Sequence, residues 1–242
     1  MIKIASSKFG CCVVAVVLAV SGTLTAQTLK ATPSQVLSPT LTAMTKLQSE
    51  FLQRVQATGF TCPFAIPAIV VEDVPSFGQY NEQTNTLRTS DWALLQPQEK
   101  AMFVQLSAPG ATEVQVRQLF EVAAHRWIFI HEMGHWVQEC LGAGSKRPPY
   151  HTEFDANRIA LAYWREVDPT VVQTMIPVFQ GVVDHMPSPV PPGQSIETYF
   201  NKNYETLGPS PAYPWFMSRM NVAAAEQSPA PSFAKTISEA GK

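Results

Sequence analysis

Two histidines and a glutamate occur at a spacing that suits a metal ion with a base beside it. The stretch reads His131-Glu132-Met133-Gly134-His135. On an α-helix, residues four positions apart lie on one face, so both imidazoles can bind a single metal ion. Glu132 directly follows the first histidine, where its carboxylate can take a proton from a metal-bound water. The H-E-x-x-H pattern therefore predicts a metal site with a general base, Glu132.

The segment that carries this motif is predicted to be a long, largely buried helix. Thr112 suits its N-cap, and no proline occurs from Thr112 to Cys140. Apolar and small residues recur at steps of three and four: Leu119, Val122, Ala123, Trp127, Ile130 and Gly134. Gly142 and Gly144 then give a stop signal. Since Gly134 has no Cβ, another backbone or a substrate can approach the helix there.

A zinc site that does chemistry usually has three protein ligands and one open position, so a third ligand must come from elsewhere. Residues 152–167 are predicted to form a second helix, which Asp168-Pro169 ends. Glu153 lies at the N-terminal end of one face of this helix, and we predict it as the third ligand. Small residues further along that face, Ala156 and Ala160, would allow close packing against the first helix.

Asn157 lies one turn beyond Glu153 on the same face. Its amide oxygen can accept the free ring N–H of a ligating histidine and so hold the ring in place. A further electrophile usually steadies the oxyanion that develops during hydrolysis. The sequence leaves this role open among four residues: Tyr150, His151, Tyr163 and His185.

The two predicted helices together resemble those of the gluzincins, the zincin metallopeptidases whose third zinc ligand is a glutamate. Residues 153–160, Glu-Phe-Asp-Ala-Asn-Arg-Ile-Ala, are similar to the E-x-E-A-[DN]-x-x-A helix of the HtpX and CAAX-prenyl protease group. The asparagine form is closer to the ImmA/IrrE group of small metallopeptidases. This resemblance covers roughly residues 65–167. It implies Zn²⁺ as cofactor, an acidic ligand at Glu153, and hydrolysis of a peptide or protein substrate by a metal-activated water.

Competing ligands fit the spacing less well. A metzincin would have glycine at 138 and histidine at 141, where this chain has Gln138 and Leu141, so that subclass is excluded. Asp155 would face about 200° away from the proposed glutamate ligand. Glu139 drifts away from the metal and is better explained as a solvated charge at the helix end. His151 remains an alternative ligand, although it precedes the second helix and fits better as a residue lining the site.

The remaining elements give an α+β fold, mostly helical, with a small sheet and hairpin packed beside the H-E-x-x-H helix. A helical stripe covers residues 41–57, a strand 65–72, and two short strands 79–88. Further helical segments are expected at 91–106 and 170–183, and the aromatic-rich segments 196–204 and 213–221 are expected to pack back on the body of the domain. In zincins the edge strand binds the substrate backbone as an added strand. The resemblance assigns that strand to residues 86–89.

The N-terminus indicates export. Lys3 and Lys8 precede an apolar run over residues 9–20, and small residues precede Gln27. This pattern predicts a signal peptide at residues 1–26 and a periplasmic or extracellular protein. The alternative is an uncleaved anchor, although the run is short for a membrane span of about 20 residues. We therefore expect no stable membrane insertion after signal removal.

The mature chain is expected to form one domain. Residues 27–222 would be the metallopeptidase domain, with 27–60 either a pro-segment or part of the fold, and 223–242 a mobile tail. Signal removal takes two lysines and no acid, so the formal charge falls from −2 to −4. Such a charge does not suggest a nucleic-acid partner. Cys62 and Cys140 either pair in an oxidising compartment or remain separate buried thiols.

Two other classes of function fit the same motif. The chain could be a non-catalytic zinc-binding envelope protein that acts in partner binding. An intact Glu132 argues against this class, because a structural zinc site closes its fourth position and needs no base. In the other class, an envelope protein carries the motif by accident or in a decayed form, and no metal would co-purify with it.

Overall fold

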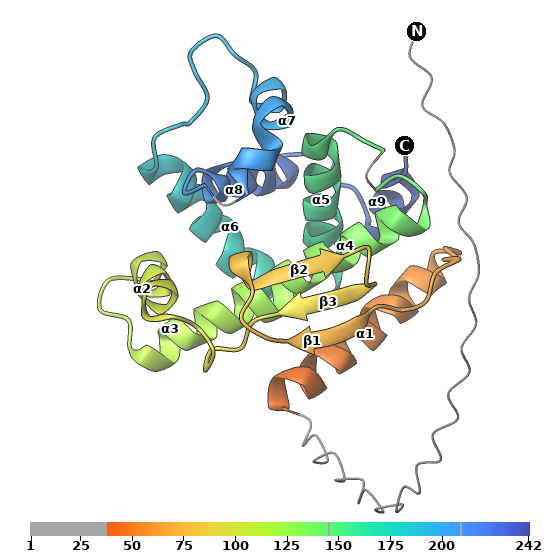
Figure 1. The fold of residues 1–242 in the computed structure, drawn as a ribbon, viewed down its shortest axis with the longest axis horizontal. Coiled ribbons are helices and arrows are strands. Elements are labelled where there is room, and N and C mark those ends of the chain that lie inside the picture. The colour runs from red at the N-terminus through yellow and green to blue at the C-terminus, as the bar shows by residue number, and fades with distance from the viewer. Residues whose placement is uncertain (1–37, 145, 209) are drawn as a thin grey trace, which may run out of the picture. The chain divides into compact units, whose positions relative to one another are not determined.

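The described part of the chain is mostly helical with one small sheet, so the predicted α+β class is confirmed (Figure 1). The computed structural model describes residues 38–144, 146–208 and 210–242, which belong to one compact unit. The predicted signal peptide lies outside the described residues. Within the described residues, no helix combines the length and apolar character that a membrane span requires. The α-helices are α1 (Pro39–Ala57), α2 (Pro97–Leu106), α3 (Glu113–Phe120), α4 (Phe129–Cys140), α5 (Pro149–Val167), α6 (Pro169–His185), α7 (Ile196–Leu207), α8 (Tyr213–Ala225) and α9 (Phe233–Glu239).

The sheet has three short strands in the order β1-β3-β2: β1 (Ala68–Val71), β2 (Gly78–Asn81) and β3 (Thr86–Thr89). β1 pairs with β3 in parallel, and β2 pairs with β3 as an antiparallel hairpin, which the sequence predicted. The assignment of residues 86–89 as the edge strand is wrong, because β3 is central. Leu87 of β3 is fully buried in the core, and the edge strand next to α4 is β2 (Figure 1).

The predicted long helix is continuous but changes its winding. Thr112 caps α3 in a capping box with Gln115. A π-helical segment, η2 (Glu121–Ile128), then joins α3 to α4. Short π-helical stretches are rare and often occur beside functional sites. The H-E-x-x-H residues themselves lie in the regular part, α4, so the two histidines retain the one-turn spacing that the motif requires.

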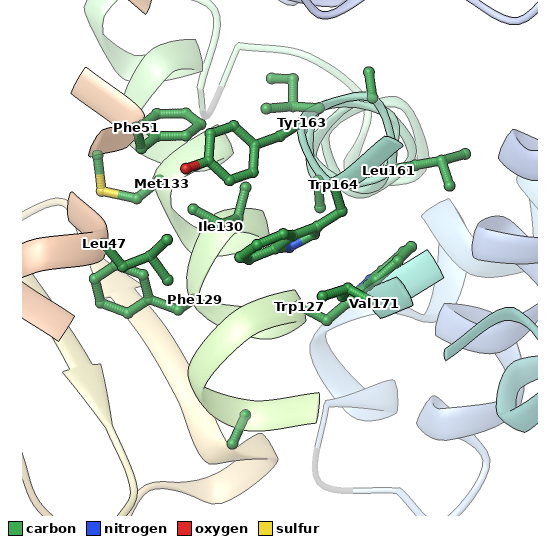
Figure 2. Packing of buried hydrophobic residues seen from close by; sticks show 14 of the residues in the cluster. Leu47, Phe51, Trp127, Phe129, Ile130, Met133, Leu161, Tyr163, Trp164 and Val171 are labelled. Atoms are coloured by element: carbon green, nitrogen blue, oxygen red, sulfur yellow. The ribbon is translucent and has the colours of Figure 1, made fainter. Parts of the chain in front are cut away.

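The main core lies where α1, α4 and α5 meet (Figure 2). Phe51 of α1 packs against Tyr163 of α5, with 5.4 Å between ring centroids, and Tyr163 packs against Trp164 at 4.9 Å. Trp127 and Ile130 fill the space from the side of the long helix and are buried to within 1% exposure. α1 is thus an integral part of the core, which places most of the ambiguous 27–60 segment within the fold.

A second, smaller cluster joins α7 and α8 to the N-terminal end of α5. Its buried members are Phe200, Leu207, Trp215, Phe216 and Met220. Tyr150 and Phe154 of α5 pack against it, with their rings stacked at 6.1 Å. Helix α5 therefore spans both clusters, the smaller at its start and the main core over its later turns.

The C-terminal segment is not the mobile tail that its composition predicted. Residues 233–239 form α9, which Ser232 caps, and Phe233 and Ile237 are each 2% exposed. The ring of Phe233 packs against Phe51 and Tyr163 of the main core. Burial of these two apolar side chains helps to hold the segment on the core despite its Ala/Ser/Pro-rich composition.

Cys62 and Cys140 form a disulfide, the pairing that the sequence left open. The bond joins the segment before β1 to the last residue of α4, across a sequence separation of 78 residues. It therefore fixes the C-terminal end of the helix that carries both histidines.

Candidate metal site

α4 and α5 cross at a point where neither helix has a large side chain. A Cβ added to Gly134 would lie 3.1 Å from the Cα and 3.3 Å from the Cβ of Ala156. The close crossing that the sequence predicted at these small residues is therefore present. It brings the first turns of α5, which carry Glu153, next to the histidines of α4.

Three donor atoms converge at this crossing. The Nε2 atoms of His131 and His135 lie 3.1 Å apart, and Glu153 Oε2 lies 3.2 Å and 3.5 Å from them. Zinc–ligand bonds of about 2.0–2.1 Å in a tetrahedron imply donors about 3.3 Å apart. The triangle therefore fits one cation of this size, as the sequence predicted for these residues.

The carboxylate of Glu153 is buried and directed at the two rings. Its residue is 4% exposed, and apart from the imidazoles its Oε2 has no hydrogen-bond partner among the described residues. Burial alone would raise the pKa of Glu153, but the neighbouring imidazoles outweigh it and hold the pKa well below its usual range. Burial alone would lower the pKa of His135, yet Glu153 and Glu132 raise it to about 9. The site thus favours a positive charge between these groups.

Side-chain amides contact the Nδ1 atoms of the two imidazole rings. His131 Nδ1 lies 2.9 Å from Asn157 Oδ1, the contact predicted from the sequence. His135 Nδ1 lies 3.0 Å from Gln138 Oε1, and the Nε2 of Gln138 donates to the carbonyl of Thr152 on α5 at 2.8 Å. When each Nδ1 donates to its amide oxygen, each Nε2 directs a lone pair toward the donor triangle. The role of Gln138 was not predicted from the sequence, although its position one turn after His135 is a recognisable signal.

Glu132 lies beside the donor triangle and is held by the sheet. Its Oε2 accepts a hydrogen bond of 2.6 Å from the backbone N–H of Tyr80 on the edge strand β2. Its Oε1 lies 4.0 Å from His131 Nε2, further than Glu153 from either ring. Donor atoms of His131, Glu132 and His135 fall within 4.8 Å of one another, so Glu132 is also within reach of a cation there. The shorter distances favour Glu153 as the third ligand and leave Glu132 as a neighbouring base.

Gly78 allows β2 to approach this helix. A Cβ at Gly78 would lie 2.5 Å from Ile128 Cγ2 and 3.6 Å from Glu132 Cγ. A larger residue would push the strand outward and break the contact between Tyr80 and Glu132.

The site opens into a cavity of about 900 Å³. Glu132, His135 and Glu153 line it together with β2 on one side and residues of α7 and α8 on the other. Cavities of about 300 Å³ and 980 Å³ elsewhere contain neither histidine of the motif. Of these three cavities, the one over α4 and α5 is therefore the cavity that candidate metal ligands line.

Two tyrosines that were not predicted from the sequence as site residues line this cavity near Glu153. Tyr204 of α7 donates its hydroxyl to Glu153 Oε1 at 3.0 Å, and Tyr213 of α8 also lines the cavity. Burial, followed by the charge of Glu153, raises the pKa of both phenols well above the ordinary value. Both therefore remain protonated hydrogen-bond donors at neutral pH. No local pattern marks them, because they reach the site only through the packing of the second cluster.

None of the four candidates for oxyanion stabilisation lines this cavity. Tyr163 packs within the main core, and its hydroxyl has no partner among the described residues. His185 ends α6 with its Nδ1 2.7 Å from the carbonyl of Gly181. The structure therefore does not bring Tyr163 or His185 together with the donor triangle.

Tyr150 and His151 lie closer in the sequence to Glu153 but turn elsewhere. Tyr150 stacks on Phe154 within the second cluster. His151 Nε2 forms an ion pair of 3.0 Å with Glu197 of α7, and neither lines the cavity. These contacts also do not support His151 as a metal ligand. The histidine of η2, His125, lies with its Nε2 2.7 Å from the carbonyl oxygen of Ser90.

Comparisons with protein-family models, curated proteins and solved structures give no match.

Proposed function

We propose that the protein is a zinc-dependent peptidase of the gluzincin type, with His131, His135 and Glu153 as ligands and Glu132 as general base. The observation that carries the proposal is the donor triangle, in which two Nε2 atoms and a buried carboxylate oxygen lie 3.1–3.5 Å from one another. Such spacing among three donor atoms at the wall of an open cavity suits a shared cation. A glutamate base and an open cavity beside the triangle support hydrolysis over a purely structural role.

Bound zinc would supply a Lewis acid that polarises the scissile carbonyl and lowers the pKa of a coordinated water. Glu132 takes the proton of the attacking water and delivers it to the leaving amine. The Tyr80 N–H bond to Glu132 Oε2 orients the carboxylate and leaves Oε1 on the side of His131. Tyr213 offers a phenol donor to the oxyanion that forms on the carbonyl, and Tyr204 offers a second one when its hydroxyl turns from Glu153 Oε1 to the carbonyl oxygen.

The substrate chain is proposed to run along β2. An edge strand has unpaired backbone N–H and C=O groups on its outer side, and a peptide can pair with them as an added strand. β2 is the edge strand that lines the cavity, with residues 78–81 all part of the wall. This strand replaces residues 86–89 as the proposed binding strand.

The proposed place of action is outside the cytoplasm, in the periplasm or the medium. The Cys62–Cys140 disulfide supports this proposal, because such bonds persist in oxidising compartments. The N-terminal sequence pattern supports it independently.

Replacement of Glu132 tests the proposed reaction. Glu132→Gln retains the ligands but removes the base, so we expect stoichiometric zinc by elemental analysis and no hydrolysis of a mixed peptide library by mass spectrometry. The matched control is Glu113→Gln at the exposed start of α3, which should cleave like the wild type. Cleavage by Glu132→Gln at the wild-type rate would contradict the mechanism. A wild-type protein that holds zinc but cleaves no peptide would favour the non-catalytic zinc-binding alternative.

A further inference from the structure

The cavity in front of the donor triangle is lined by an excess of carboxylates. Glu132 and Glu153 belong to the site itself. Three further acids line the walls: Glu82 after β2, Glu139 in the last turn of α4, and Glu205 in α7. They come from three separate segments of the chain, so the acidic lining is spread over different walls of the cavity instead of marking one helix end.

The two arginines of the lining do not offset these three acids. Arg88 pairs with Glu72 and also donates to Gln79 Oε1 at 2.6 Å. Arg147 donates to Asp155 at 2.7 Å and to the carbonyl of Ala240 at 3.0 Å. Both cations are thus balanced by carboxylates outside the lining. Glu82, Glu139 and Glu205, in contrast, have no ion-pair partner within the described ranges.

The negative potential reaches β2 on one side of the cavity. There, burial and then the charges of Glu139 and Glu82 raise the pKa of Tyr80. A divalent cation on the histidines would balance Glu132 and Glu153. The three wall acids would remain as a net negative charge.

We propose that this cavity selects cationic peptides, with lysine or arginine side chains flanking the bond that is cleaved. Carboxylates at the rim of a concave site concentrate cationic ligands and speed their association. Cleavage of the selected peptide rests on the function proposed above, whereas its selective binding does not. Within the described residues, no hydrogen bond or ion pair joins the wall acids to the donor triangle, so their removal should raise KM for cationic peptides and leave kcat nearly unchanged.

Binding to an inactive protein tests the proposal without turnover. The probes are two fluorescein-labelled alanine-rich octapeptides, one with two lysines and one with two glutamates, measured by anisotropy with zinc-loaded Glu132→Gln. We expect the lysine peptide to bind on the order of tenfold more tightly, and the difference to shrink as salt screens exposed charges. Equal affinities for the two peptides at low salt would overturn the proposal.

A triple variant locates the effect. Adding Glu82→Gln, Glu139→Gln and Glu205→Gln to the inactive protein should abolish most of the preference for lysine. The charge-matched control, Glu113→Gln with Asp184→Asn and Glu226→Gln, removes three exposed acids outside the lining and should keep it. An equal loss in both variants would overturn the proposal, because only overall charge would then matter.

Cleavage assays with the wild-type protein distinguish a failure of this inference from a failure of the proposed function. Preferential binding of the lysine peptide by a wild-type protein that cleaves neither peptide would support charge selection and contradict the peptidase. Cleavage of both peptides with equal kcat/KM would support the peptidase and overturn charge selection.

Discussion

The two helix pairs that meet at the cavity are built very differently. α4 and α5 cross in backbone contact at Gly134 and Ala156, within the main core, and they carry all three donor atoms. α7 and α8 carry Tyr204 and Tyr213 and rest on a smaller cluster of five buried side chains. Glu153 of α5 contacts the imidazoles of α4 on one side and the Tyr204 hydroxyl of α7 on the other.

This difference suggests a division of labour. Dense packing, the disulfide and the amide contacts hold the donors of α4 and α5 to one arrangement, as a metal site requires. The phenols lie outside the donor triangle, on helices that pack on the start of α5 through the smaller cluster. We therefore expect changes in α4 and α5 to act on metal affinity, and changes in α7 and α8 to act on turnover.

The largest effect is expected from a direct ligand. His131→Ala removes one of the three donors, so zinc affinity should fall by more than about 100-fold, beyond the range typical of residues that only support a ligand. Competition with a chromophoric chelator measures the affinity. Circular dichroism serves as the folding control. Zinc affinity within a few-fold of the wild type would show that this helix pair is not the metal site.

A smaller loss is expected from the amide behind the same ring. Asn157→Ala removes the acceptor 2.9 Å from His131 Nδ1 and leaves the donors intact. Residues in such supporting positions change metal affinity by about 10–100-fold. Asn221→Ala on α8, a buried asparagine that bonds the carbonyl of Met217 instead, is the matched control and should keep zinc affinity.

The crossing itself can be tested with two glycine substitutions of opposite expected sign. Gly134→Ala places a methyl group 3.1 Å from the Cα of Ala156, where backbone cannot yield easily. We expect a loss of about 1–3 kcal/mol in unfolding free energy from overpacking. Gly181→Ala within α6 meets nothing within 4 Å and should gain about 0.5–1 kcal/mol. Urea unfolding measures both, and a stabilised Gly134→Ala would contradict the close crossing.

The smallest effect on zinc binding is expected from the phenol pair. Tyr204→Phe removes the hydrogen bond to Glu153 Oε1 in an open cavity, where water can replace it. Zinc affinity should fall by less than about tenfold, while loss of an oxyanion donor lowers kcat by about 100-fold. Parallel zinc titration and steady-state kinetics separate the two. A fall in zinc affinity with no separate fall in kcat would mean that Tyr204 only supports the ligand Glu153.

The sequence predicted the α4–α5 pair far better than the α7–α8 pair, for a physical reason. The spacing of the two histidines and the small residues at 134 and 156 are local patterns on helices, and a helix converts such patterns directly into one face. Because Glu153 shares a helix face with Ala156, the same patterns predicted that its carboxylate would lie near the two histidines. Whether these residues act as ligands remains a proposal.

The parts that the sequence did not predict depend on contacts between distant segments. Tyr204 and Tyr213 approach Glu153 only because aromatic residues of α7 and α8 pack on the start of α5. The central place of β3 depends on its parallel pairing with β1, which short strands do not reveal. Composition also gave a wrong prediction for the C-terminus, because α9 docks through the buried side chains of Phe233 and Ile237 and through the ion pair between Arg158 and Glu239.

The most direct test of the metal site is a crystal structure of zinc-loaded Glu132→Gln with an anomalous difference map at the zinc edge. Our account predicts one strong peak within about 2.0–2.2 Å of His131 Nε2, His135 Nε2 and a Glu153 carboxylate oxygen. Absence of a peak at saturating zinc, or a peak with Glu153 turned away from the histidines, would contradict it.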